Sequence, residues 1–198
     1  LFSELSPVAL FELTSGDQRL GGISGADFLD DNTLIMVTDQ GDLIWIDIDP
    51  ETSQLATSAY TTFLKDENGD PLDGKTLTDA EGVAWSGELL FISFERNHRV
   101  LAFDIEGCGA AARGIPITSF EARDLDLSTR MTANGGAEAL ALIDTETLVI
   151  GLETRGSDPA PIASTKVTET GIPSFAATLN APEATSLTGL DVIDGDRA

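Results

Sequence analysis

Two glutamates of the sequence share a local context in which a charged side chain is unusual. Glu81 lies in "TLTDAEGVAW" and Glu138, 57 residues further along, in "NGGAEALALI", each between small residues and ahead of an apolar run. A carboxylate in such a place must be compensated by a cation, a bound proton or hydrogen bonds. Ser24 in "LGGISGADFL" lies 57 residues before Glu81, and Thr188 in "SLTGLDVIDG" lies 50 residues after Glu138. This recurrence indicates a structural repeat with a polar residue at one fixed place.

A second acid follows each of the first three positions across a short turn. The turns are rich in Asp, Asn, Gly, Ser, Thr and Glu, and the apolar runs on either side have the length of strands, which predicts β-hairpins. Residues at equal distances from a hairpin turn face one another on the paired strands. The predicted facing pairs are Ser24 with Asp39, Glu81 with Glu95, and Glu138 with Glu153.

These acids could hold a cation if the hairpins bring them to one opening. Carboxylates about 5 Å apart repel by roughly 3 kcal/mol a pair at an effective dielectric constant near 20. Oxygen-only ligands favour a hard cation, with calcium first and magnesium second. The alternative is structural, because glutamates at strand starts could accept backbone N–H bonds from a neighbouring unit or pair with Arg96 and Arg155. The predicted metal ligands are Asp39, Glu81, Glu95, Glu138 and Glu153.

The densest basic stretch of the sequence, "FERNHRV", follows the strand that ends near Glu95. We expect it at the same rim as the acids, where an arginine could bind phosphate or carboxylate as a planar fork. The alternative is that these arginines pair with local acids. The predicted catalytic residues are Glu81, Glu138 and His98. The predicted substrate-binding residues are Arg96, Arg99, Arg155 and Ser24.

Two other patterns are poor matches to known sites. A Ser-His-Asp triad would need His98, the single histidine, but "GISGA" around Ser24 lacks the spacing and the helix of a nucleophile elbow. The stretch "DENGDPLDG", residues 66–74, begins like a calcium loop, but Pro71 replaces the expected Gly and Leu77 the expected Glu. A hydrated turn is favoured there.

The elements that must position these residues are short strands. Each period of about 57 residues holds four strand-like stretches, and helical spacing with capping signals is not convincing anywhere. Antiparallel four-stranded units that repeat in this way are typical of β-propeller blades. We predict an all-β chain, residues 1–198, as one incomplete propeller domain of about three and a half blades whose C-terminal blades are missing. Residues 7–14 are expected to form an outer strand.

Composition excludes several classes of protein. The chain has 198 residues and 41% hydrophobic residues, which is enough for one sizeable core. Its apolar runs are far shorter than the roughly 18 residues of a transmembrane helix. The net charge of −23 disfavours nucleic acid and anionic membranes as partners. The single cysteine, Cys108, excludes an internal disulfide.

The repeat motifs resemble those of a known family of propellers. "GGISGADF" with "VTDQGDL", "DAEGVAW" with "FISFERNHRV", and "NGGAEALAL" with "LVIGLET" look like successive blades of the "esterase-like activity of phytase" family, over roughly residues 20–195. The resemblance implies a bacterial protein that is exported, as a periplasmic, secreted or lipid-anchored chain. It also implies calcium and a small-molecule ester or phosphoester substrate, with the acidic residues above on the family's motif positions.

Three functions remain open on the sequence. The first is a metal-dependent hydrolase with calcium among the rim acids, in which Arg96, His98 or Arg155 would stabilise developing negative charge. The second is a non-catalytic propeller that binds a ligand or a protein partner and uses the acids as struts between blades. The third is a gluconolactonase-type propeller, whose Asn-rich ligand set this chain matches less well. The lack of a run of Lys and Arg for several phosphates disfavours inositol hexaphosphate as the substrate.

Overall fold

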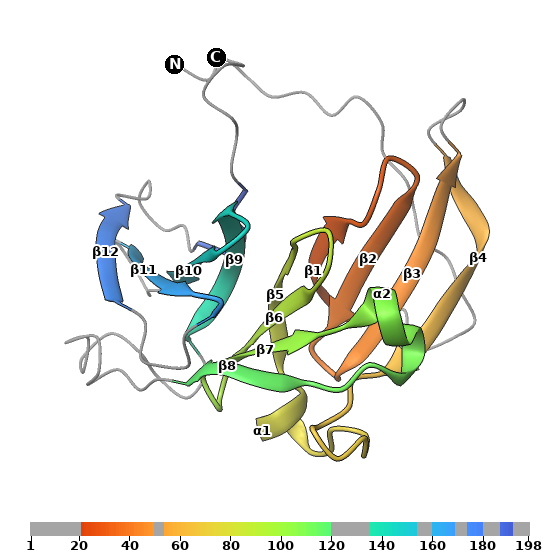
Figure 1. Ribbon diagram of the computed structural model, residues 1–198, viewed down its shortest axis with the longest axis horizontal. Helices are drawn as coiled ribbons and strands as arrows, with labels where there is room; N and C mark the ends of the chain where they lie inside the picture. The colour runs from red at the N-terminus through yellow and green to blue at the C-terminus, as the bar shows by residue number, and fades with distance from the viewer. Residues whose placement is uncertain are drawn as a thin grey trace.

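The computed structural model describes residues 21–49, 54–119, 135–153, 160–168, 174–179 and 187–191. Within them the chain forms three four-stranded antiparallel sheets, each made of four consecutive strands in chain order. Figure 1 shows the sheets side by side, with β5–β8 between the other two. The strands are β1 (Ile23–Phe28), β2 (Thr33–Thr38), β3 (Asp42–Asp49), β4 (Gln54–Phe63), β5 (Ala80–Trp85), β6 (Leu90–Phe94), β7 (Arg99–Phe103), β8 (Ile115–Ser119), β9 (Ala137–Asp144), β10 (Thr147–Leu152), β11 (Ala160–Lys166) and β12 (Ser174–Leu179).

The first strands of the three sheets lie next to one another, as the inner strands of propeller blades do. Strand β1 packs against β5, and β5 packs against β9. The prediction of four-stranded antiparallel propeller blades is therefore confirmed. Three blades are seen in the described residues, and these do not close into a ring. Residues 7–14 lie outside the described part of the chain, as does most of the fourth repeat, and residues 187–191 contain no strand.

The three predicted hairpins are present, but at the strand starts their register differs by two residues from the one predicted from the turns. Gly25 pairs with Val37 in the first blade, and Val83 pairs with Ile92 in the second. The second turn is closed by Ser86, whose N–H donates to the Leu89 carbonyl at 3.1 Å. The residue just after each second strand therefore lies opposite the residue that precedes the first strand.

Two one-turn helices interrupt the β pattern. Helix α1 (Lys75–Thr78) lies in the connection between the first and second blades, and α2 (Ile105–Cys108) follows β7 and leads into a 3-10 turn at Gly109–Ala111. Sequence periodicity could not indicate them, because four residues are too few to show a helical repeat. Helix α1 carries Lys75 to the blade rim, where it contacts Asp39 and Asp79.

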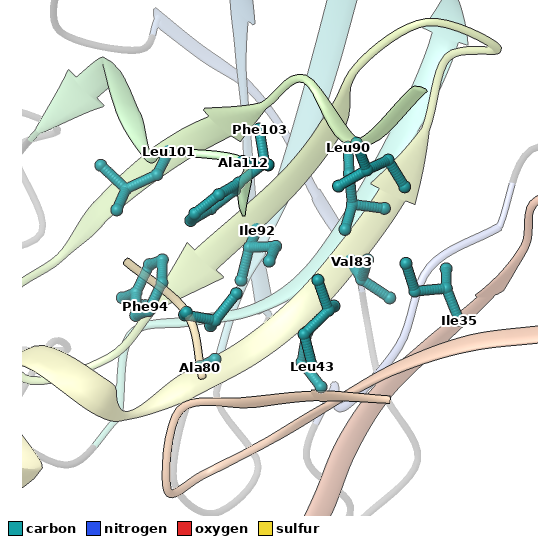
Figure 2. Close-up of a cluster of buried hydrophobic side chains, with 13 residues drawn as sticks. Ile35, Leu43, Ala80, Val83, Leu90, Ile92, Phe94, Leu101, Phe103 and Ala112 are labelled. Carbon is teal, nitrogen blue, oxygen red and sulfur yellow. The ribbon is translucent and has the colours of Figure 1, made fainter. Parts of the chain in front are cut away.

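The hydrophobic core consists of layers between neighbouring blades. Figure 2 shows Ile35 and Leu43 of the first blade facing side chains of the second, such as Val83 and Ile92. A second layer lies between the second and third blades and contains Phe91. The middle blade is covered on both faces, so that every residue of β6 and of β7 is buried. Truncation of a fully buried phenylalanine in these layers to alanine is expected to cost about 3–5 kcal/mol.

The inner strands approach one another through glycines. A Cβ at Gly25 would lie 2.6 Å from the backbone oxygen of Glu81, and one at Gly82 would lie 2.8 Å from the backbone nitrogen of Leu140. Backbones that pass this closely bring the strand starts of adjacent blades together. The residues beside these glycines, Ser24 and Glu81, therefore meet the neighbouring blade.

Candidate metal centre

The four glutamates lie at equivalent places in the second and third blades. Glu81 and Glu138 are the second residues of β5 and β9, while Glu95 and Glu153 directly follow β6 and β10. A backbone hydrogen bond fixes each of the latter two: the N–H of Glu95 donates to the Asp79 carbonyl at 2.8 Å, and that of Glu153 to the Gly136 carbonyl at 2.8 Å. The register therefore differs from the predicted pairs. Glu95 faces Asp79 and Glu153 faces Gly136, each two residues before the glutamate that was expected to face it, because the pairing is irregular at the starts of β5 and β9.

The fold brings carboxylates together in two groups that share Glu95. One group is Asp79, Glu81 and Glu95, and the other is Glu95, Glu138 and Glu153. The ligand oxygens within each group lie within 4.8 Å of one another. These distances suit a cation that takes several oxygen ligands. The four glutamates predicted from the sequence are therefore gathered at one rim, and their role as metal ligands remains a prediction.

Glu95 has an oxygen with no partner. The residue is only 3% exposed, and its Oε1 accepts no hydrogen bond from the described part of the chain. A buried carboxylate oxygen left without a donor is destabilising by several kcal/mol unless a cation or a proton satisfies it. This oxygen is an acceptor that fits a hard cation.

The titration of the cluster reflects burial and mutual repulsion. The pKa of Glu81 is raised from 4.5 to about 7, first by burial and then by the charges of Asp79 and Glu95. Burial is also the main cause that raises the pKa of Glu138 and that of Glu95. Protonated Glu138 donates a hydrogen bond to Glu95, which stabilises the proton on Glu138. Near neutral pH the cluster therefore takes up protons or requires a positive ion.

Asp79 is a member of the cluster that the sequence analysis missed. It is 1% exposed and forms ion pairs with Lys75, four residues earlier, and with Arg96, whose Nε lies 2.5 Å from Asp79 Oδ2. The 57-residue spacing contained the signal. Asp79 occupies the repeat position held by Gly22 in the first blade and by Gly136 in the third. The acid at this position of the second blade, where the first and third blades have glycine, was therefore the sequence signal for an additional member of the cluster.

Arg96 forms an ion pair with Asp79, an acid that the sequence analysis did not propose as its partner. Arg96 has φ 54, which makes it the one non-glycine residue with a positive φ in the described chain. This left-handed conformation is disfavoured by roughly 1 kcal/mol for a residue with a side chain. It directs the guanidinium back toward Asp79, at the start of β5.

Asp39 is the acid of the first blade, and it is held by Lys75. Its Oδ2 lies 2.9 Å from Lys75 Nζ, and Nζ also donates to the Asp39 carbonyl at 3.0 Å. The Asp39 carboxylate is 39% exposed and is not in either of the two carboxylate groups. Among the described residues, Lys75 therefore links Asp39 to the cluster through Asp79.

The other predicted site residues have different surroundings. The Ser24 hydroxyl donates to the Ala80 carbonyl at 2.5 Å. Arg99 is buried over the Phe94 ring, 4.1 Å from its centroid, and donates to the Leu77 carbonyl at 2.7 Å; burial lowers its pKa to about 10. The His98 ring lies against Gly136, where a Cβ would meet it at 2.2 Å. Arg155 lies outside the described residues. Their catalytic and substrate-binding roles remain predictions.

Hydrogen bonds from a side chain to the backbone of the neighbouring blade are made by residues other than the glutamates in the described part of the chain. Ser24 bonds to Ala80 as above, and the Ser93 hydroxyl donates to the Ala137 carbonyl at 2.9 Å. Asp27 accepts the N–H of Trp85 at 2.7 Å. Within the described residues, no backbone N–H donates to the side chains of the four glutamates. Because other side chains make these links between blades, the arrangement favours the glutamates as cation ligands rather than as struts between blades.

The loop at residues 66–74 is a hydrogen-bonded turn. Asp66 Oδ1 accepts the N–H groups of Asn68 and Asp70, at 2.9 and 3.0 Å. These backbone donors lower the pKa of the Asp66 carboxyl. The carboxylate is engaged by its own loop, as the sequence analysis favoured.

With the blades and the acidic rim established, comparison with known proteins supplies the family. The family model described as "Phytase-like: Esterase-like activity of phytase" matches residues 18–198. The chain belongs to this phytase-like family. The resemblance inferred from the blade motifs is therefore confirmed. No curated protein matches the chain.

Solved structures similar to this phytase-like chain are propeller or extracellular domains at low identity. One is the β-propeller domain of Myceliophteria thermophila Cps50 (Swd1), with 12% identity and a TM-score of 0.44, over 85% of this chain and 46% of that one. Another is the extracellular domain of a protein described as a hybrid two-component system from B. thetaiotaomicron, with 15% identity and a TM-score of 0.36, over 93% of this chain and 25% of that one. The chain thus spans less than half the length of either. None of the helices in the described residues has the length and apolar character needed to cross a membrane.

Proposed function

We propose that this phytase-like chain is a calcium-dependent hydrolase of small ester or phosphoester substrates, with its site at the acidic blade rim. The observation that carries the proposal is the buried Glu95 oxygen without a donor, at the junction of two groups of carboxylates. The donor set consists of oxygens alone, which fits a hard cation such as calcium. Glu95, Glu138 and Glu153 would hold the ion.

The residues around that position have properties that suit hydrolysis. Calcium, when bound, would supply positive charge that polarises a carbonyl or phosphoryl oxygen. Glu81, with a pKa of about 7, is suited to accept a proton from an attacking water near neutral pH. Arg96 is held by Asp79 with its side chain 33% exposed, so that it can also face an anionic substrate group.

An exported location, periplasmic or secreted, is part of the proposal. Calcium sites of extracellular modules bind at roughly 10⁻⁴–10⁻³ M, a range that is filled outside the cytoplasm. The net charge of −23 is also in keeping with an exported, acidic protein.

The test is turnover of p-nitrophenyl acetate and p-nitrophenyl phosphate by the intact chain, with calcium present and with calcium chelated. We expect calcium-dependent turnover that falls by about 10² or more in Glu81→Gln, because the general base is lost. Glu88→Gln, in an exposed hairpin turn, is the matched control and should retain full activity. A chain that neither turns over these esters nor melts at a higher temperature with calcium would contradict the proposal.

A second candidate function is a non-catalytic, cation-dependent binding propeller. It is favoured by the engagement of two predicted substrate-binding residues within the fold, Ser24 with Ala80 and Arg99 with Leu77. A rise in melting temperature with calcium, without turnover of either ester, would support this candidate over the hydrolase.

A further inference from the structure

The ammonium group of Lys75 occupies a position lined by oxygen atoms. Nζ contacts the backbone oxygen of Asp39 at 3.0 Å, Asp39 Oδ2 at 2.9 Å, and Asp79 Oδ1 in a shorter ion pair. One backbone carbonyl and two carboxylates from different blade connections are also a ligand set that calcium takes in proteins. Lys75 therefore lies where a cation could lie.

The two carboxylate groups that share Glu95 differ in their compensation. In the first, Asp79 is paired with Lys75 and with Arg96. In the second, neither Glu138 nor Glu153 has an ion pair within the described part of the chain. Two positive charges thus offset the Asp79 side, while the Glu138 and Glu153 side has the donor-free Glu95 oxygen.

The position of Lys75 allows its ammonium group to be displaced from the rim by an incoming cation. It lies on the single-turn helix α1, and its side chain is 46% exposed. A lysine is a mobile point charge on a flexible stem, whereas the Arg96 guanidinium is planar and lies on a buried carboxylate. The ion pair of Lys75 with Asp39 is exposed at both ends and contributes little, so an incoming cation can compete with it. Asp39 Oδ1, which has no hydrogen-bond partner in the described residues, would be available to an incoming ion.

We propose that Lys75 is a tethered counter-ion that occupies the second cation position of the rim. This inference rests on the proposed cation site and extends it to the order of binding. One divalent cation binds first at Glu95, Glu138 and Glu153. A second binds at Asp39 and Asp79, the two residues that contact the Lys75 ammonium, only when that ammonium is displaced. At low calcium concentration only one ion is therefore bound. Because the second ion must displace the ammonium of Lys75, its binding makes the rim respond to higher calcium concentrations.

The experiment is calcium titration of the metal-free intact chain by calorimetry, together with equilibrium dialysis to count bound ions. The original chain should bind one calcium ion tightly. Lys75→Met should bind two, with the second site tightened by about tenfold or more, equivalent to 1.4 kcal/mol. Lys75→Arg keeps the charge and should still bind one. Lys166→Met removes a lysine that pairs with Glu146 elsewhere, and it should behave as the original chain does.

Glu153→Gln distinguishes the two positions. It removes a ligand of the first position alone, so the tight site should weaken while Lys75→Met in the same chain still gains its own ion. Two tight ions in the original chain, or no added ion in Lys75→Met, would overturn the inference.

The proposed function fails separately from this inference. If the original chain binds one calcium ion and hydrolyses neither ester, the hydrolase proposal is contradicted, while a second bound ion in Lys75→Met would still support the counter-ion role. If the original chain binds no calcium, both the proposed cation site and the order of binding inferred from it are contradicted.

Discussion

The first and second blades share the same backbone at the rim and differ in the side chains placed on it. In each, the residue after the second strand donates its N–H to the residue that precedes the first strand: Asp39 to Gly22, and Glu95 to Asp79. In the first blade the strand start carries Ser24, whose hydroxyl bonds to the next blade. In the second, the equivalent Glu81 is half-buried among other acids and has a raised pKa. One position of the repeat thus serves as a strut in one blade and as part of a charged site in the next.

The repeated units of this chain therefore keep the same backbone hydrogen bond at the rim, while the side chains at equivalent positions have different roles. The hydrogen bond at the rim needs only a carbonyl and an N–H, which any residue provides. The side chain at that place is then free to differ, and its neighbours across the blade interface determine what it does. Substitutions at four rim positions should therefore change the free energy of unfolding by different amounts and in different directions. These positions are Asp79, Glu81, Ser24 and Asp39.

Asp79→Asn should show the largest loss of stability. It removes the buried partner of Lys75 and Arg96, and we expect a loss of about 2 to 3 kcal/mol in the free energy of unfolding, because a buried ion pair loses one member. Urea denaturation at about pH 5.5 is the suitable measurement, since Glu81 is then largely protonated and relief of its repulsion contributes little. Asp70→Asn, on the exposed turn, is the control, and equal stability of the two variants would exclude Asp79 as the ionic centre of the rim.

Glu81→Gln should have the opposite sign in the metal-free chain. The folded pKa of Glu81, about 7, exceeds the ordinary 4.5, so the folded state binds more protons and its stability falls as pH rises between these values. Glutamine does not titrate, so Glu81→Gln abolishes this fall in stability with rising pH. We expect a gain on the order of 2 kcal/mol at about pH 8 and no change at about pH 4.

Chemical denaturation of this variant at both pH values, with divalent ions chelated, measures the effect. A strut would behave in the reverse way, with destabilisation by Glu81→Gln at every pH. Excess calcium should cancel the difference between the variant and the original chain at high pH, because the ion offsets the repulsion that glutamine abolishes.

Ser24→Ala should lower stability by about 1 kcal/mol. The substitution leaves the Ala80 carbonyl without its hydroxyl donor at the interface between the first two blades. Thermal denaturation compared with Ser119→Ala, at an exposed strand end, isolates this contact. An unchanged melting temperature would mean that the hydroxyl is not a strut.

Asp39→Asn should have the smallest effect, below about 1 kcal/mol, because its ion pair with Lys75 is exposed at both ends. The loss should shrink further in about 0.5 M salt, which screens such pairs. A loss as large as that of Asp79→Asn would show that the first blade is as dependent on its rim charge as the second.

Local pattern was sufficient to predict the blades and the meeting of the four glutamates. The turn residues around Ser86 and Asp144 close hairpins with internal hydrogen bonds. Counting along the strands placed Glu95 opposite Glu81, whereas the irregular start of β5 places it opposite Asp79. The 57-residue period then predicts that equivalent residues reach the same rim. Even Asp79, which was missed, was visible as an acid at a position that is otherwise glycine.

The contacts of the basic side chains could not be predicted from the sequence in the same way. For Arg96 the sequence left open whether it binds substrate or pairs with local acids such as Glu95, and its left-handed backbone directs it to Asp79 at the adjacent strand start. Arg99, predicted at the substrate, is buried over Phe94 because its strand is covered on both faces. Lys75 reaches the rim on a helix too short to leave a periodic pattern.

From the amino-acid order alone follow the hairpins, their period and the acids at their ends, because turn chemistry and the alternation of a strand act over a few neighbouring residues. The tertiary structure decided which acids share Glu95, which are neutralised by Lys75 and Arg96, and which oxygen is left without a donor. Those outcomes depend on the distance between blades, and that distance is set by glycines and apolar layers far along the chain from the charges themselves.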